Sequence, residues 1–136
     1  MLRALASSFV FTALLSTSAF AADKPLSPQQ KQLLIKEVTA IFTNKCASCH
    51  DTATARKQEQ TEDRLRAIKK VDYILDLPRV ARSLVKGTNP NDSDLWYEVN
   101  ENMPPKDSGI DRLSKKELQV IEMWIRQGAP VPAKGR

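Results

Sequence analysis

The chain of 136 residues has few of the residues that build metal and disulfide sites: one histidine and two cysteines. A single histidine excludes any site within one subunit that needs two imidazoles, and two cysteines exclude a disulfide-rich framework. Beyond its first 22 residues the chain also lacks a run apolar enough to cross a bilayer, so no stable membrane insertion is expected. Its basic residues are interleaved with acidic ones, which argues against nucleic-acid binding.

The N-terminus has the layout of a secretory signal peptide. Arg3 precedes an apolar stretch at residues 9–15, and an A-x-A cleavage pattern ends at Ala21. We expect cleavage after Ala21, which makes residues 1–21 the signal peptide and residues 22–136 a single soluble domain exported to the periplasm. The alternative is an uncleaved N-terminal anchor, although the apolar stretch is short for a membrane span.

Helical signals dominate the exported part. Ser27 and Gln30 form a capping box with Pro28 at the first helical position, and apolar residues then recur at helical spacing as far as Phe42. A first helix is therefore expected to lead directly into residue 46. Three further segments are predicted to be helical: the later part of 51–70, then 78–86 with Gly87 as its C-cap, and 93–99 with Ser93 as its N-cap.

The last helix has the clearest signals. Ser114 and Glu117 form a second capping box, with Leu113 and Leu118 at the positions of a hydrophobic staple. The buried stripe of this helix is expected to consist of Leu118, Ile121, Trp124 and Ile125, and Gly128 ends it. The sequence shows neither a strand pattern nor an internal repeat, so it predicts an all-α fold.

Residues 46–50 read C-A-S-C-H, the attachment motif of a c-type haem. In such a motif the thiols of Cys46 and Cys49 form thioethers to the porphyrin, and the imidazole of His50 binds the iron. One turn of backbone places both sulfurs along one edge of the ring and the histidine under the metal. Two other interpretations are weaker: a thiol–disulfide oxidoreductase needs a strand–helix alternation that this chain lacks, and a zinc site needs more ligands.

A haem iron that transfers electrons needs a second axial ligand, and no other histidine is present. Met103 lies in N-M-P-P, where two prolines stiffen the loop and reduce the entropy cost of holding the thioether toward iron. Met123 lies inside the last helix beside Trp124 and is more plausible as packing. Met103 is therefore the predicted distal ligand. The alternatives are that a lysine or a water is the distal ligand, or that the distal position is open. In each of these cases Met103 would be an ordinary loop residue.

These motifs together resemble a monohaem c-type cytochrome of class I, and more narrowly the planctomycete-type cytochrome c domain. The resemblance covers most of residues 30–130. Beside the motif at 46–50, it is carried by G-T-N-P-N-D-S-D-L-W at 87–96, M-P-P at 103–105, L-S-K-K-E-L at 113–118 and W-I-R-Q-G-A at 124–129. It implies a bundle of about four to five helices around one covalently bound haem, with residues 22–136 as the cytochrome c domain.

In that family the histidine of the motif is the proximal ligand and the methionine of M-P-P is the distal one, roles that carry over to His50 and Met103. The family's first and last helices cross near the haem edge, which would set Phe42 against Trp124. One departure is Asp51, since many relatives have a glycine after the histidine, and a loop carbonyl that orients the imidazole. The sequence does not identify the partner of His50 in this chain.

The function expected from these features is electron transfer. We expect an electron carrier, or the electron-transfer subunit of an oxidoreductase, rather than an enzyme; His50 and Met103 would hold its haem iron. The alternative is a haem enzyme or gas-binding sensor with an open or displaceable distal site. Such a site needs a polar distal group, for which an arginine would have to replace the missing histidine.

The charge of the chain bears on its partners. A formal net charge of +5 favours periplasmic or membrane redox partners with acidic docking surfaces. The lysines that flank the motifs, Lys45, Lys106, Lys115 and Lys116, predict a weak, salt-sensitive contact, and the alternative is that they only solubilise the chain. Arg79 and Arg82 are candidates for pairing with haem propionates, with a solvated helix face as the alternative.

Overall fold

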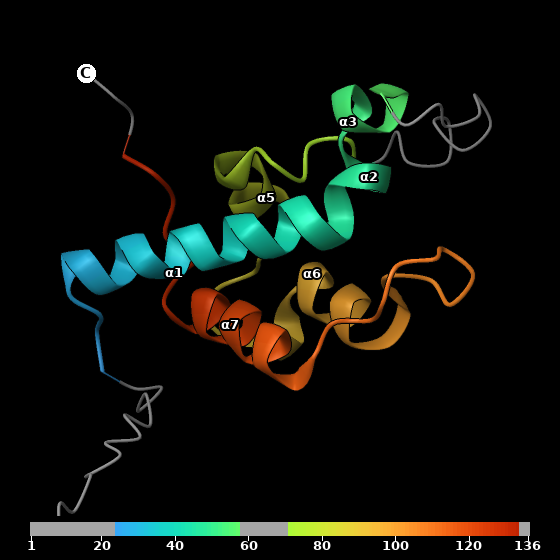
Figure 1. Cartoon of the computed structure of the whole chain (residues 1–136). Coiled ribbons are helices and arrows are strands. Elements are labelled where there is room, and N and C mark those ends of the chain that lie inside the picture. The colour runs from blue at the N-terminus through green and yellow to red at the C-terminus, as the bar shows by residue number, and fades with distance from the viewer. Residues whose placement is uncertain (1–23, 58–70, 134–136) are drawn as a thin grey trace, which may run out of the picture.

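The computed structural model describes residues 24–57 and 71–133 (Figure 1). The predicted signal peptide at 1–21 and the helix predicted in the later part of 51–70 lie outside the described residues. The motif at 46–50, the M-P-P loop and the last helix lie inside them.

In the described part the chain is helical. Its elements are α1 (Pro28–Ile41), η1 (Phe42–Cys46), α2 (Ala47–His50), α3 (Thr52–Lys57), α5 (Leu77–Leu84), η3 (Pro90–Asp92), α6 (Asp94–Tyr97), η4 (Glu98–Asn102) and α7 (Lys115–Arg126). The segments η1 and η4 are π-helical, and η3 is a 3-10 turn. Over residues 24–57 and 71–133 no strand forms, apart from one isolated bridge between Asp51 and Tyr73. The all-α class is thus confirmed.

The long helix α1 lies across α7, and this crossing forms the centre of the core (Figure 1). The apolar positions predicted for the first helix are all buried: Leu34, Val38, Ile41 and Phe42. They meet Ile121, Trp124 and Ile125 of α7, which are fully buried, whereas Leu118 is only partly so. The rings of Phe42 and Trp124 pack edge to face with centroids 6.1 Å apart. The contact implied by the family resemblance is therefore present.

The C-terminal end of α7 is fixed by several hydrogen bonds. Gly128 adopts φ +76°, which only glycine reaches easily, and turns the chain away from the helix. The chain then returns so that the indole Nε1 of Trp124 donates to the carbonyl oxygen of Pro130 at 2.8 Å. The side chain of Gln127 accepts a hydrogen bond from the backbone N–H of Leu26 at 3.2 Å. Both ends of the described chain are thus attached to α7.

Two predicted caps differ from the structure. The helix predicted over 78–86 ends at Leu84, and Val85 is already extended, so Gly87 lies beyond its cap. Ser93 does occupy the N-cap position of α6, but its Oγ makes no capping bond. Instead, the Lys86 N–H donates to Ser93 Oγ at 3.0 Å. This bond holds the chain extended after α5, which is why the helix stops early.

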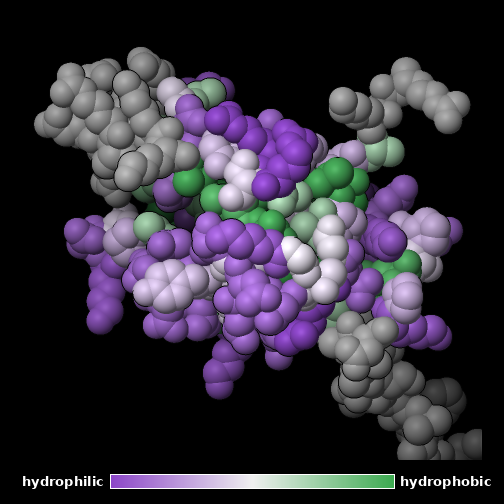
Figure 2. All heavy atoms as spheres, turned by 180° about the vertical axis from the view of Figure 1, so that it is seen from behind, coloured by the Kyte–Doolittle hydropathy of each residue, from purple (hydrophilic) through white to green (hydrophobic). Residues whose placement is uncertain are grey.

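On the face shown in Figure 2, hydrophilic side chains cover most of the surface, and hydrophobic ones gather in a central band. The large hydrophobic residues that remain exposed come from separate segments: Leu33, Leu75, Tyr97 and Val131. Among the described helices, none combines the length and apolar character needed to span a bilayer.

The second capping box gives a testable dependence on pH. The Ser114 N–H donates to Glu117 Oε2 at 2.7 Å, and this backbone hydrogen bond lowers the pKa of Glu117 below its ordinary 4.5. Because the folded pKa is depressed, the charged carboxylate stabilises the fold fully above about pH 4.5, and this contribution is lost as the pH falls through the lowered pKa.

We expect E117Q to be less stable than the wild type at neutral pH, and this difference in stability to disappear in acid. Urea denaturation at both pH values measures this. E37Q is the control, since Glu37 is exposed on α1; a gap that is the same at both pH values would contradict the prediction.

Candidate functional site

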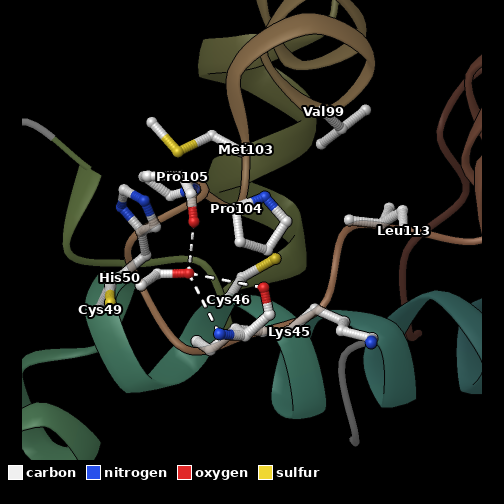
Figure 3. A pocket seen from close by; sticks show the side chains of 11 residues that line it. Lys45, Cys46, Cys49, His50, Val99, Met103, Pro104, Pro105 and Leu113 are labelled. Atoms are coloured by element: carbon white, nitrogen blue, oxygen red, sulfur yellow. Dashed lines mark hydrogen bonds between the residues drawn. The ribbon is translucent and has the colours of Figure 1, made fainter.

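A hollow opens between the segment η1–α2 and the loop that follows η4 (Figure 3). It has a volume of about 330 Å³, part of which is open to solvent. All four residues singled out by the sequence line it: Cys46, Cys49, His50 and Met103. The rest of the lining is mainly apolar and consists of Val99, Pro104, Pro105, Ile110 and Leu113, with Lys45 and Ser108 as further polar members. The fold thus brings the two predicted motifs together.

Each wall of the hollow begins with a π-helical turn. In η1 the Ala47 N–H donates to the carbonyl oxygen of Phe42, and at the end of η4 the Met103 N–H donates to that of Glu98 at 2.7 Å. A π turn holds about one residue more than an α turn, so the side chains after it are rotated by about 100° relative to an unbroken helix. Phe42 can therefore stay in the core while Cys46 lines the hollow. Sequence reasoning missed both turns, although such turns are frequent at functional sites.

The two cysteines lie one turn apart, with Cys46 at the end of η1 and Cys49 within α2. Both carry thiols, and Ala55 of α3 packs against Cys49. Burial, together with the nearby Cys49, raises the pKa of the Cys46 thiol to about 12. A thiol that exchanges with disulfides needs a lowered pKa so that its thiolate is available at neutral pH. The shift at Cys46 goes the opposite way, which disfavours the thiol–disulfide interpretation.

The imidazole of His50 is held by a segment that the sequence did not point to. Its Nδ1 lies 3.0 Å from the carbonyl oxygen of Val71, and its own carbonyl accepts a hydrogen bond from the Ile74 N–H at 3.1 Å. A carbonyl oxygen can only accept, so the proton of the neutral ring is on Nδ1 and the lone pair is on Nε2. This is the tautomer in which Nε2 can bind a metal. The Val71 carbonyl is therefore the partner that the sequence could not identify.

Asp51, where the sequence departs from the pattern that it resembles, caps the next helix and bridges to Tyr73. Its Oδ2 accepts hydrogen bonds from the N–H and the Oγ1 of Thr54 at 2.8 and 2.6 Å, which caps α3. Its backbone forms the bridge to Tyr73. An aspartate at this position starts a helix immediately after His50, where the family that the sequence resembles often has a glycine.

Met103 occupies the opposite wall, and in Figure 3 its thioether lies near the His50 ring. The peptide bond to Pro104 is cis, and Pro104 is buried. Contacts at the far end hold the loop against the helices: Arg112 donates to the carbonyl oxygen of Asn100 at 3.1 Å, and Lys45 donates to that of Asp111 at 3.3 Å. The other candidate, Met123, packs against the core from α7 and does not line the hollow.

Ser108 closes this loop on itself. Its hydroxyl donates to the carbonyl oxygen of Pro105 at 2.6 Å, and its Oγ accepts from the Ile110 N–H at 3.2 Å (dashed lines in Figure 3). We expect S108A to speed hydrogen exchange of the Ile110 amide roughly two- to ten-fold, because a hydrogen bond of this kind contributes about 0.5–1.5 kcal/mol. Amide exchange by NMR measures the effect, and S108T should restore the slow rate. S83A, on the exposed face of α5, is the control. An Ile110 rate equal to that of the wild type would contradict the prediction.

Most of the lysines that flank the motifs lie close to acidic residues in the chain. Lys106 is exposed beside Asp107, and the exposed Lys115 and Lys116 precede Glu117. The ammonium of Lys45 is engaged with the Asp111 carbonyl. The docking contact predicted for the lysines thus stays a prediction. Neither of the arginines proposed for propionates, Arg79 and Arg82, lines the hollow.

In the described part of the chain, the hollow lacks the ligand set of a bare metal ion. Nowhere in the described ranges do three side chains of the types His, Cys, Asp and Glu converge to hold such an ion. Cys46, Cys49 and His50 are therefore not arranged like a zinc site, in which the ligands surround the metal.

Comparisons with family models, curated proteins and solved structures give no match for this chain. Its function must therefore be inferred from the lining residues. Two thiols on one turn, an imidazole with its lone pair on Nε2 and a thioether across the hollow are the donors that a c-type haem requires. The residues would fit such a group through their donors and their apolar lining.

Proposed function

We propose that the protein is an exported monohaem c-type cytochrome of the class I kind, which transfers single electrons between redox partners. The observation that supports this most directly is that Cys46, Cys49, His50 and Met103 line one hollow, with the His50 Nδ1 on a backbone carbonyl. When bound, a haem supplies a one-electron couple between ferric and ferrous iron.

The residues of the chain would share the work of holding this group. The Cys46 and Cys49 thiols would add across its two vinyl groups, His50 would bind iron through Nε2, and Met103 would bind through its sulfur. The Val71 carbonyl keeps the His50 ring in the right tautomer and orientation. Apolar neighbours such as Ile110 and Leu113 would exclude water from the group and disfavour its more highly charged ferric state, which would raise the potential.

Other features support the proposal less directly. The crossing of α1 and α7, with Phe42 against Trp124, agrees with the class I arrangement that the resemblance implies. The signal peptide predicted from the sequence at residues 1–21 supports export to the periplasm. The basic net charge supports periplasmic or membrane redox partners with acidic surfaces, whether the protein is a separate carrier or a subunit of an oxidoreductase.

The alternative function, a haem enzyme or gas-binding sensor, needs an available polar group beside the distal position. Two polar side chains of the described lining are already engaged: the Ser108 hydroxyl donates to the Pro105 carbonyl, and the Lys45 ammonium donates to the Asp111 carbonyl. Among the described residues that line the hollow there is no arginine. Electron transfer is therefore the better-supported function.

The test uses protein exported by a host with haem-attachment machinery. Its intact mass should exceed that of the polypeptide by one haem, and its oxidised spectrum should show the weak far-red band of sulfur–iron ligation. The control is C46S/C49S, in which the mass increment should vanish. A wild-type mass equal to the polypeptide alone would refute the proposal, and rapid binding of carbon monoxide to the ferrous protein would favour the alternative.

A further inference from the structure

The backbone of segment 71–74 makes three contacts with His50 and Asp51, at the end of the motif. The carbonyl of Val71 faces the His50 Nδ1 at 3.0 Å, Tyr73 bridges to Asp51, and the Ile74 N–H donates to the His50 carbonyl at 3.1 Å. The orientation of the imidazole therefore depends on how firmly this segment is held in place.

Arg79 extends toward this segment from the start of α5, which is held in the core. The N–H of Arg79 donates to the Asp76 carboxylate at 3.1 Å, which caps α5, and the neighbouring Leu77 and Val80 are buried in the core. From this position the guanidinium lies over the Tyr73 ring, with its Cζ 3.8 Å from the ring centroid.

The contact with the ring is the stronger of the two that the guanidinium makes. Its Nη1 lies 3.9 Å from Asp72 Oδ1, and the two side chains are 52% and 39% exposed, so this ion pair contributes little. A guanidinium stacked over a tyrosine face is attracted by the ring quadrupole even at an exposed site. Arg79 thus connects a helix anchored in the core to the segment that holds His50.

We infer that Arg79 is a positioning residue for His50: by stacking on Tyr73 it keeps the Val71 carbonyl against the imidazole. This role rests on the proposed function, in which His50 is an axial ligand. A firm hydrogen bond from Nδ1 to a carbonyl raises the basicity of Nε2, and a more basic ligand favours ferric iron and lowers the potential. Loosening the segment should therefore raise the potential.

His50 is the only histidine in the chain, so protein labelled with ¹⁵N-histidine gives the signals of one imidazole. The measurement is the rate at which its Nδ1 proton exchanges with solvent in the reduced, exported protein. We expect R79Q to speed this exchange about two- to five-fold, the size expected from losing an exposed cation–π contact. R82Q is the matched control, because Arg82 lies on the same helix, is exposed, and makes no hydrogen bond or ion pair with any described residue.

A second set of variants tests whether Arg79 acts on His50 through the Tyr73 ring. Y73F keeps the aromatic face and should behave like the wild type, whereas Y73L should speed exchange as R79Q does. In the Y73L background, R79Q should add nothing further. If R79Q keeps its full effect there, the Tyr73 ring does not carry the interaction.

Redox titration completes the test of Arg79, and intact mass tests the proposed function separately. R79Q should raise the midpoint potential relative to both the wild type and R82Q. Equal exchange rates in R79Q and R82Q, or equal potentials, would overturn the positioning role. Intact mass tests the proposed function independently: if the exported chain lacks the haem increment, that function is wrong, while the exchange rates on the same chain still decide whether Arg79 steadies His50.

Discussion

Replacing Met103 with alanine should remove the far-red band from the oxidised, exported protein and lower its midpoint potential. Met103 is the methionine that lines the hollow, and histidine–methionine ligation gives higher potentials than ligation by nitrogen donors. Axial ligands shift haem potentials over a range of about 0.8 V, so we expect a fall on the order of 0.1 V or more. Absorption spectra and redox titration measure both effects.

The matched control is M123A. Met123 packs against the core from α7, outside the hollow, so its removal should leave the band and the potential unchanged. M123A should still destabilise the fold, by roughly 2 kcal/mol or less, because the side chain is only partly buried. A far-red band that persists in M103A would show that another group is the distal ligand.

Replacing Trp124 with alanine should give the largest loss of stability in the chain. Trp124 is fully buried at the crossing of α1 and α7, packs against Phe42 and donates to the Pro130 carbonyl. The substitution removes a large aromatic side chain and leaves that carbonyl without its donor, at a cost of about 3–5 kcal/mol. Urea denaturation monitored by circular dichroism measures the change in the free energy of unfolding.

Two variants make this result specific. W124F keeps an aromatic ring against Phe42 but lacks the indole N–H, so it should cost less than W124A. Y97A removes an aromatic side chain that is 60% exposed on α6 and should change stability by no more than about 0.5 kcal/mol. If W124A costs no more than Y97A, the helix crossing is not the centre of the core.

The sequence predicted those parts of the fold that depend on side chains at regular spacing. Both capping boxes form at Ser27 and Ser114, and the stripe that ends at Phe42 is buried against α7. These features are local or periodic, so one sequence is enough to identify them. The early end of α5 was missed because it depends on a hydrogen bond from Lys86 to Ser93, two residues brought together by the turn between them.

The donor residues of the site could be predicted from the sequence, but the groups that orient them could not. The spacing of Cys46, Cys49 and His50 and the prolines after Met103 are visible in the sequence. The Val71 carbonyl is a backbone group, which has no side-chain signature, and its position depends on the tertiary fold. The stacking of Arg79 on Tyr73 is likewise a tertiary contact between an exposed charge and a ring, and the sequence pattern would equally fit a solvated helix face.

Because of the π-helical turns, the direction in which the donor side chains point depends more on the number of residues in the turn than on which residues they are. Thr43 and Asn44 in η1 are exposed, so exchanging one polar residue for another there leaves the core and the count of residues in the turn intact. Losing one of them would return the turn to α-helical winding and swing the thiols and the imidazole about 100° around the helix axis. A relative that kept every motif but dropped one residue from this turn would thus present its sulfurs to a different side of the bundle.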